Sequence, residues 1–264
     1  MDFQIKSKVA LVTGSTAGIG YAIAKQLAAE GASVVINGRT AERVNAAVES
    51  IINETGNQDV KGLIADFSNI DQINKLISDL PEVDILINNV AIFEPKEFDD
   101  ITDEDWLKFY EVNVMSGIRL SRAYFTKMLQ KDWGRIVFIS SESAIQIPKE
   151  MIHYGMTKTA QIALARGLAE LTKVTNITVN SVLPGPTASE GVGGFIENLA
   201  KEQSKTIDEV ETDFFKTMRP TSIIQRFLTT DEVANMVTYL SSPLAAATNG
   251  AAIRAEGGLL KTAF

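Results

Sequence analysis

The sequence predicts an α/β fold in which one doubly wound parallel sheet carries helices on both faces. Short strands of continuous apolar residues, such as residues 9–13 and 84–88, alternate with helix-length segments. Such strands are typical of a parallel sheet that is buried on both sides. Residues 1–264 contain no linker, repeat or low-complexity tract, so we expect a single domain. Ligands of such sheets bind in the crevice beyond the carboxyl ends of the strands.

Apolar periodicity and glycine positions place the individual elements. The first helix, for example, has Ile19, Ile23, Ala24 and Leu27 on one face and ends near Gly31. In chain order we expect strands at 9–13, 33–37, 60–65, 84–88, 135–139 and 177–183. We expect helices at 19–30, 41–55, 70–80, 103–130 and from about 154 to about 173.

Composition excludes several classes of protein. The 25 basic and 33 acidic residues give a net charge of −8 without long runs of either sign, which disfavours nucleic acid and anionic membranes as partners. There is no cysteine and one histidine, His153, so we expect no metal site. The first residues lack a signal-peptide core, and no apolar run approaches the roughly 18 residues of a membrane span. We therefore expect a cytoplasmic protein.

A glycine-rich segment joins the first strand to the first helix. Residues 13–20 read Thr-Gly-Ser-Thr-Ala-Gly-Ile-Gly. Glycines allow a tight turn and the close approach of a pyrophosphate, which a helix N-terminus attracts. The spacing differs from the common G-x-G-x-x-G fingerprint, and a purely structural turn is the alternative. The candidate cofactor contacts in this loop are Gly14, Ser15, Thr16, Gly18, Ile19 and Gly20.

The residues at the end of the second strand indicate which dinucleotide binds. An acidic residue there would bond a ribose 2′-hydroxyl and repel a 2′-phosphate. The chain instead has Asn37-Gly38-Arg39, without a carboxylate. The Arg39 guanidinium can offer two parallel hydrogen bonds to a phosphate. We therefore expect NADP(H) to be preferred over NAD(H), unless Arg39 is only a solvated surface charge.

Tyr154 and Lys158 are spaced i, i+4 in an apolar helical segment, which places both side chains on one face. A lysine beside a tyrosine favours the phenolate and so lowers the phenol pKa from its reference value of about 10. A pair of serines, Ser140 and Ser141, precedes them. We interpret Tyr154 as a general acid/base and Lys158 as the group that tunes it.

These motifs, in this order, resemble the short-chain dehydrogenase/reductase family, in particular its 3-oxoacyl reductases. The resemblance runs from about residue 6 to residue 258. It adds Asp66, the segment Asn-Asn-Val-Ala at 88–91, Asn113 within 111–114, and Asn-Ser-Val-Leu-Pro-Gly at 180–185. The resemblance implies a Rossmann-type fold and hydride transfer between nicotinamide and a ketone or secondary alcohol, including 3-oxoacyl compounds.

The resemblance also implies a role for each matching residue. Tyr154 would exchange a proton with the substrate oxygen, while Ser141, rather than Ser140, would hydrogen-bond that oxygen. Lys158 would also hold the nicotinamide ribose, and Asn113 would hold a water that links Lys158 to solvent. Outside the glycine loop, the implied cofactor contacts are Arg39, Asp66, Asn89, Tyr154, Lys158, Pro184, Gly185 and Thr187.

Residues 190–219 are longer than an ordinary connection, and we expect them to form a lid over the substrate. Two apolar helical faces occur there, one of Phe195, Ile196 and Leu199 and one of Phe214, Phe215 and Met218. They would build an apolar pocket, or else belong to the core or to an oligomer contact. We expect Glu142 near this pocket. There it would favour a cationic or hydroxyl-bearing substrate; the alternative is that its side chain is solvated.

The expected partners are a small carbonyl or alcohol substrate and further copies of the chain, as a tetramer or dimer. An acyl-carrier protein would need a basic patch, for which Arg119, Arg122, Lys127 and Lys131 are candidates. The alternative to a reductase is a non-catalytic nicotinamide-dinucleotide sensor, although such proteins usually lack the tyrosine. A divergent enoyl reductase is disfavoured because its tyrosine and lysine are spaced more widely.

Overall fold

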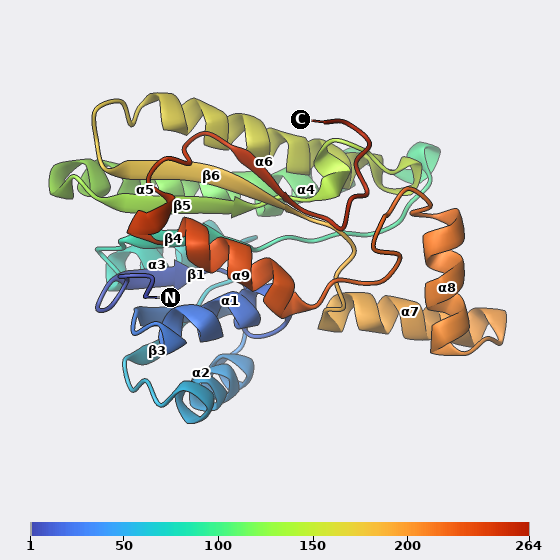
Figure 1. Ribbon diagram of the computed structural model, residues 1–264, viewed down its shortest axis with the longest axis horizontal. Helices are drawn as coiled ribbons and strands as arrows, with labels where there is room; N and C mark the ends of the chain where they lie inside the picture. The colour runs from blue at the N-terminus through green and yellow to red at the C-terminus, as the bar shows by residue number, and fades with distance from the viewer. Residues whose placement is uncertain (1, 264) are drawn as a thin grey trace.

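The computed structural model describes residues 2–263, apart from the side chains of Phe195, Asn198 and Leu199. Within these residues, seven strands form one parallel sheet in the order β3-β2-β1-β4-β5-β6-β7 (Figure 1). The strands are β1 (Val9–Val12), β2 (Ser33–Gly38), β3 (Val60–Ile64), β4 (Ile85–Asn88), β5 (Gly134–Ile139), β6 (Ile177–Pro184) and β7 (Ala252–Ala255). The predicted doubly wound α/β fold is confirmed.

Helices cover both faces of the sheet because alternate strand residues point to opposite sides. One core contains Ala10 and Val12 of β1 and the apolar faces of α1 (Gly18–Ala29), α2 (Ala41–Thr55) and α9 (Thr230–Leu240). The other contains Leu11 and side chains of α3 (Ile70–Asp79), α5 (Ser116–Lys131) and α6 (Ile152–Glu170). No helix within residues 2–263 has both the length and the apolar character needed to cross a membrane.

The helix predicted over 103–130 is interrupted in the structure. α4 (Asp103–Tyr110) is followed by a π-helical turn at Glu111–Met115, and α5 begins only after it. Such turns are frequent at functional sites. Asn113 lies in the turn, fully buried, and its side chain bonds the main chain of Ile92. Through these bonds, Asn113 connects the segment after β4 to the π-helical turn that precedes α5.

Two elements, α9 and β7, were not predicted. α9 begins with a capping box, in which Thr229 and Glu232 bond each other's main-chain N–H groups. A Thr-x-x-Glu pattern before apolar residues is a sequence signal for this box. β7 is a short edge strand along β6, with Ile253 beside Val182, and it has no long apolar run to mark it. The C-terminal segment beyond β7 buries Leu259 and Leu260 within this chain.

The segment predicted as a lid, residues 190–219, contains two helices, α7 (Glu190–Gln203) and α8 (Ile207–Thr217). Figure 1 shows both helices projecting beyond one end of the sheet. Thr206 and Glu209 form a capping box at the start of α8, so this helix has a strong local start signal. Part of one predicted apolar face, Phe195 and Leu199, lies outside the described side chains.

Candidate active site

The predicted site residues gather in loops at the carboxyl ends of the strands. Two cavities lie there, of about 370 and 610 Å³, and they share Asn89 and Ala91 in their walls. The strand order reverses between β1 and β4. Ligands of doubly wound sheets bind at this switch point. The predicted motifs converge at this same switch point.

The loop after β1 is shaped to receive a phosphate group. Gly14 and Gly18 adopt φ values of +61° and +60°, a left-handed conformation that favours glycine. A Cβ on Gly20 would lie 2.5 Å from the Gly14 carbonyl oxygen, so only glycine fits there. The N-terminus of α1 has no side-chain cap, whereas Thr40 caps α2. An uncapped helix start offers N–H groups and positive potential to an anion. These residues fit a dinucleotide pyrophosphate.

Ser15 does not face either cavity, although it was predicted as a cofactor contact. Its hydroxyl is fully buried, donates to the Val12 carbonyl at 2.7 Å and accepts from the Asn37 N–H at 3.0 Å. The Asn37 side chain in turn accepts from Gly14 N–H at 3.0 Å, and the Asn89 amide donates to Gly14 O at 3.1 Å. Ser15 and the two asparagines therefore hold the loop in shape.

The larger cavity is flanked by cationic and acidic groups. Arg39 and Arg43 lie in its wall on the β2 side, and Asp66 lies after β3. A hydrogen bond from the Ser68 main chain holds the pKa of Asp66 below its usual value, and the charge of Arg39 acts in the same direction. Sequence reasoning missed Arg43, which sits in the first turn of α2 and pairs with Glu190 of α7 at 2.6 Å. Two guanidinium groups thus lie in the wall of this cavity.

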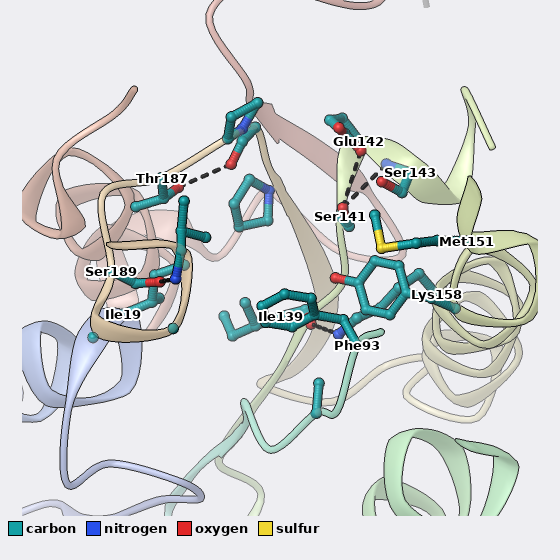
Figure 2. A pocket seen from close by; sticks show the side chains of 18 of the residues that line it. Ile19, Phe93, Ile139, Ser141, Glu142, Ser143, Met151, Lys158, Thr187 and Ser189 are labelled. Carbon is teal, nitrogen blue, oxygen red and sulfur yellow. Dashed lines mark hydrogen bonds between the residues drawn. The ribbon is translucent and has the colours of Figure 1, made fainter. Parts of the chain in front are cut away.

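The smaller cavity joins the glycine loop to the predicted catalytic residues. Gly18, Ile19 and Gly20 lie in its wall together with Ser141, Tyr154, Lys158, Pro184, Gly185 and Thr187. Figure 2 shows Ile19 and Thr187 on one side of this cavity and Ser141 and Lys158 on the other. Tyr154 and Lys158 share a face of α6, as their spacing predicts. The structure therefore brings the two halves of the predicted site together.

Lys158 is held by main-chain and side-chain acceptors. It is 2% exposed, and its Nζ donates to Ile139 O at 2.8 Å and to Gln161 Oε1 at 3.3 Å. The Nζ lies 5.6 Å from the centre of the Tyr154 ring. Burial lowers the pKa of the Lys158 ammonium to about 7. The Lys158 ε-amino group can therefore gain or lose a proton near neutral pH.

The Tyr154 phenol has a raised pKa, contrary to the expectation from its spacing to Lys158. Burial is the main cause; a hydrogen bond with Ser141 opposes it, and the charge of Glu142 adds to it. The predicted lowering is wrong for this arrangement because the Lys158 Nζ is directed to Ile139 and Gln161. A phenol of raised pKa keeps its proton at neutral pH, but it is a weaker general acid than a group whose pKa lies near the operating pH.

The lowered pKa of Lys158 predicts a specific dependence of stability on pH. Unfolded Lys158 titrates near 10.5 and folded Lys158 near 7, so unfolding takes up a proton between these values. Stability therefore rises with pH in this window. We expect the difference in unfolding free energy between the wild type and Lys158→Met to grow by roughly 2 kcal/mol from about pH 7.5 to about pH 9.5.

Denaturant unfolding at several pH values measures this difference, and Lys149→Met, at an exposed position, is the matched control. Parallel pH profiles for the wild type and Lys158→Met would contradict the lowered pKa.

Gln161 connects Lys158 to Asn113 and was missed by sequence reasoning. Its Nε2 donates to the Asn113 main-chain oxygen at 2.6 Å, and its Oε1 accepts from Lys158. The Asn113 side chain is fully engaged, since its Nδ2 donates to Ile92 O and to Thr157 Oγ1. Gln161 follows Lys158 at i+3 on the same helix, and this spacing was the available signal. The Gln161 carboxamide therefore bridges Lys158 and the Asn113 main chain, and the water link from Lys158 to solvent stays a prediction.

The lid helices supply apolar side chains to the smaller cavity. Phe214 and Met218 lie in its wall, together with Phe93, Val192 and Phe227. The rings of Phe214, Phe215 and Phe227 pack against one another with centroids 5.1 Å apart, and Phe215 meets each of the other two edge to face. Phe215 and Ile196 are buried. In the predicted face of Phe214, Phe215 and Met218, Phe214 and Met218 therefore line the cavity, whereas Phe215 belongs to the core.

Glu142 is not solvated, as one alternative from the sequence had it. It is 3% exposed and pairs with Arg219, whose Nε donates to Glu142 Oε1 at 3.0 Å. The Arg219 Nη1 lies 3.3 Å from Glu150 Oε1. Arg219 follows α8 at the end of the lid segment and was missed from the sequence. The ion pair therefore connects the lid to the segment after β5.

The remaining candidates lie away from the cavities. His153 is buried against Phe109, with ring centroids 4.0 Å apart, and burial lowers its pKa. In the proposed acyl-carrier patch, Arg119 pairs with Glu111, and Lys131 pairs with Glu82 and Asp84. The last turn of α5 contains Lys131 and leads into the start of β5. It therefore lies at the amino ends of the strands, opposite to the cavities. Two of the four candidate cations, Arg119 and Lys131, are therefore already engaged in ion pairs.

Comparisons with known proteins agree with this geometry. The family profile described as short chain dehydrogenase matches residues 8–217. The chain is 48% identical over 264 residues to the uncharacterized oxidoreductase YvaG of Bacillus subtilis, with 100% of both chains covered. It is 33% identical over 263 residues to the 3-oxoacyl-(acyl-carrier-protein) reductase FabG of Aquifex aeolicus, covering 98% of this chain and 100% of the relative.

A solved structure of L-sorbose reductase from Gluconobacter frateurii, complexed with NADPH and L-sorbose, superposes with a TM-score of 0.92. It is 29% identical, and the alignment covers 99% of this chain and 100% of that one. The match to the family profile spans most of the chain, and the relatives align over almost their whole length. The chain therefore belongs to the short-chain dehydrogenase family and is an oxidoreductase.

Proposed function

We propose that this oxidoreductase transfers hydride between NADP(H) and a ketone or secondary alcohol. The observation that carries the proposal is the single cavity that holds Tyr154, Ser141 and Lys158 and extends to the glycine loop at Gly18–Gly20. Bound NADPH would supply the hydride that reduces the carbonyl carbon. Gly18, Ile19 and Gly20 would hold its pyrophosphate, and Pro184, Gly185 and Thr187 would line the nicotinamide side.

The proposed role of each catalytic residue follows from the proton or hydrogen bond that it can donate. The Tyr154 hydroxyl donates its proton to the carbonyl oxygen, and the Ser141 hydroxyl donates a hydrogen bond to the same atom. Lys158 holds the nicotinamide ribose and, with its pKa near 7, returns a proton toward Tyr154. Asn113 supports this step by fixing Gln161 against Lys158. This role adds to the water-holding role that the resemblance implied.

A panel of ketones tests the proposal, with NADPH absorbance as the readout. We expect turnover of at least one neutral ketone by the wild type. NADPH binding without turnover of any ketone or 3-oxoacyl thioester would favour the alternative, a dinucleotide sensor. The FabG and sorbose reductase relatives act on different carbonyl compounds by name, so the panel includes both thioesters and ketoses.

Arg39 and Arg43 are proposed to select NADP(H) by binding its 2′-phosphate. Hydrogen bonds to charged groups contribute about 1.5–3 kcal/mol, so we expect Arg39→Ala to weaken NADPH binding about tenfold or more. NADH affinity should change much less, because NADH lacks the phosphate. Nucleotide fluorescence titrations measure both affinities, and Arg226→Ala, an exposed arginine paired with Glu232, is the control. An unchanged NADPH preference would contradict the assignment.

Self-association is also proposed, as a tetramer or dimer. The support is a set of large apolar side chains exposed on the helices of one layer, including Leu107 at 69% and Leu171 at 61%.

A further inference from the structure

Ser141 and Glu142 share a hydrogen bond in the wall of the smaller cavity. The Ser141 Oγ donates to Glu142 Oε2 at 3.1 Å and accepts from the Ser143 main-chain N–H at 3.1 Å (Figure 2). A serine hydroxyl has only one proton to donate. In this arrangement Glu142 accepts the hydrogen bond from that proton, although the proposed reaction needs it at the carbonyl oxygen of the substrate.

Glu142 is fixed in this position from the lid side. Its Oε1 accepts from Arg219 Nε at 3.0 Å, and Arg219 is 8% exposed and also donates to Met218 O at 2.9 Å. The carboxylate therefore stays in place when the serine proton turns toward a substrate. Glu142 Oε2 would then lose its donor, and a buried carboxylate oxygen without a partner is unfavourable. A hydroxyl group of the substrate can donate the replacement hydrogen bond to Glu142 Oε2.

We propose that the enzyme prefers ketones that carry a hydroxyl group on the carbon next to the carbonyl. The two oxygens of such a ketone lie on adjacent carbons and can face the adjacent Ser141 and Glu142 side chains together. The carbonyl oxygen accepts from Ser141 and Tyr154, and the neighbouring hydroxyl donates to Glu142 Oε2. This inference rests on the proposed reductase function and narrows its substrate class.

The chemical step is balanced by groups already named. The carbonyl carbon receives hydride from NADPH and forms a new C–H bond, and the π-electron pair moves onto the oxygen. That oxygen takes the Tyr154 proton, so the ketone is reduced to a vicinal diol as NADPH is oxidised. The neighbouring hydroxyl gains and loses no covalent bond and remains hydrogen-bonded to Glu142.

The charges around Glu142 separate this class from keto acids. Glu142 and Glu150 both lie in the cavity wall, and both pair with the one guanidinium of Arg219. The cluster keeps an excess of negative charge. A substrate carboxylate in place of the neutral hydroxymethyl group would meet Glu142 as a like charge, which disfavours it.

Three small substrates of closely similar size test the inference. Hydroxyacetone carries the hydroxyl, butanone has a methyl group in its place, and pyruvate has a carboxylate. We expect kcat/KM for hydroxyacetone to exceed that for butanone by about ten- to hundredfold, as for one hydrogen bond to a charged group. Pyruvate should be the poorest of the three.

Glu142→Gln should reduce the hydroxyacetone-to-butanone ratio several-fold and improve pyruvate, because the acceptor loses its charge. Glu150→Gln is the matched control, since Glu150 contacts Arg219 but not Ser141, and it should retain the ratio. Equal turnover of hydroxyacetone and butanone by the wild type would overturn the inference and leave the reductase function standing. A preference for pyruvate, or a full ratio in Glu142→Gln, would also overturn it. No turnover of any of the three would overturn the inference, whereas the wider panel of ketones and thioesters decides the reductase function separately.

Discussion

Tyr154→Phe should lower kcat for ketone reduction by about 10²–10⁴-fold, the usual contribution of a positioned general acid. The substitution removes only the hydroxyl that would donate a proton to the carbonyl oxygen. The phenyl ring can keep its edge-on contact with Phe93, whose ring centroid lies 6.3 Å away. NADPH affinity should stay within a few-fold of the wild type, since the ring and Lys158 remain in place.

Steady-state kinetics with NADPH and fluorescence titration of the nucleotide measure the two effects separately. Tyr110→Phe is the matched control, because Tyr110 is 42% exposed and lies outside both cavity walls. Unimpaired turnover by Tyr154→Phe would remove Tyr154 from the chemistry. A loss of nucleotide binding equal to the loss of turnover would give it a binding role instead.

Ser141→Ala should lower kcat by about 10²–10³-fold, the effect of deleting one donor to a developing oxyanion. The Ser141 hydroxyl lies in the same cavity wall as Tyr154 and is the second donor proposed for the reacting oxygen. Its loss also leaves Glu142 Oε2 without its hydrogen bond. We therefore expect a reduction in stability of about 1–3 kcal/mol alongside the kinetic effect.

Ser140→Ala separates these effects, because Ser140 Oγ donates to the Lys158 main-chain oxygen at 2.8 Å and has a structural bond to lose. It should lower stability with a much smaller change in kcat. Kinetics and thermal unfolding of both variants provide the comparison. A larger kinetic loss in Ser140→Ala than in Ser141→Ala would reverse the assignment of the two serines.

The parts of the site that follow local sequence rules could be predicted. The apolar strand at 9–13, its glycine loop and the helix behind it are contiguous, so their geometry follows from turn and helix rules. Tyr154 and Lys158 lie one turn apart on one helix and were predicted to share a face. The ion pair between Arg219 and Glu142 joins residues far apart in the chain, and no spacing rule indicates it.

The protonation states depend on burial and could not be predicted from spacing. Lys158 suggested a lowered Tyr154 pKa, but desolvation in the folded chain shifts both groups toward their neutral forms. The interruption at Glu111–Met115 likewise arises from tertiary contacts of Asn113 with Ile92 and Thr157. Helical periodicity alone cannot reveal such a turn.

The central claim is that this cavity transfers hydride from nicotinamide to a carbonyl carbon. A single-turnover reaction with NADPH deuterated at both hydrogens of nicotinamide C4, followed by mass spectrometry of the alcohol, tests it directly. We expect one deuterium on the carbinol carbon with the wild type, and a much slower appearance of the same product with Tyr154→Phe. An alcohol without deuterium, or labelled NADPH that binds and is never oxidised by any ketone, would contradict the account.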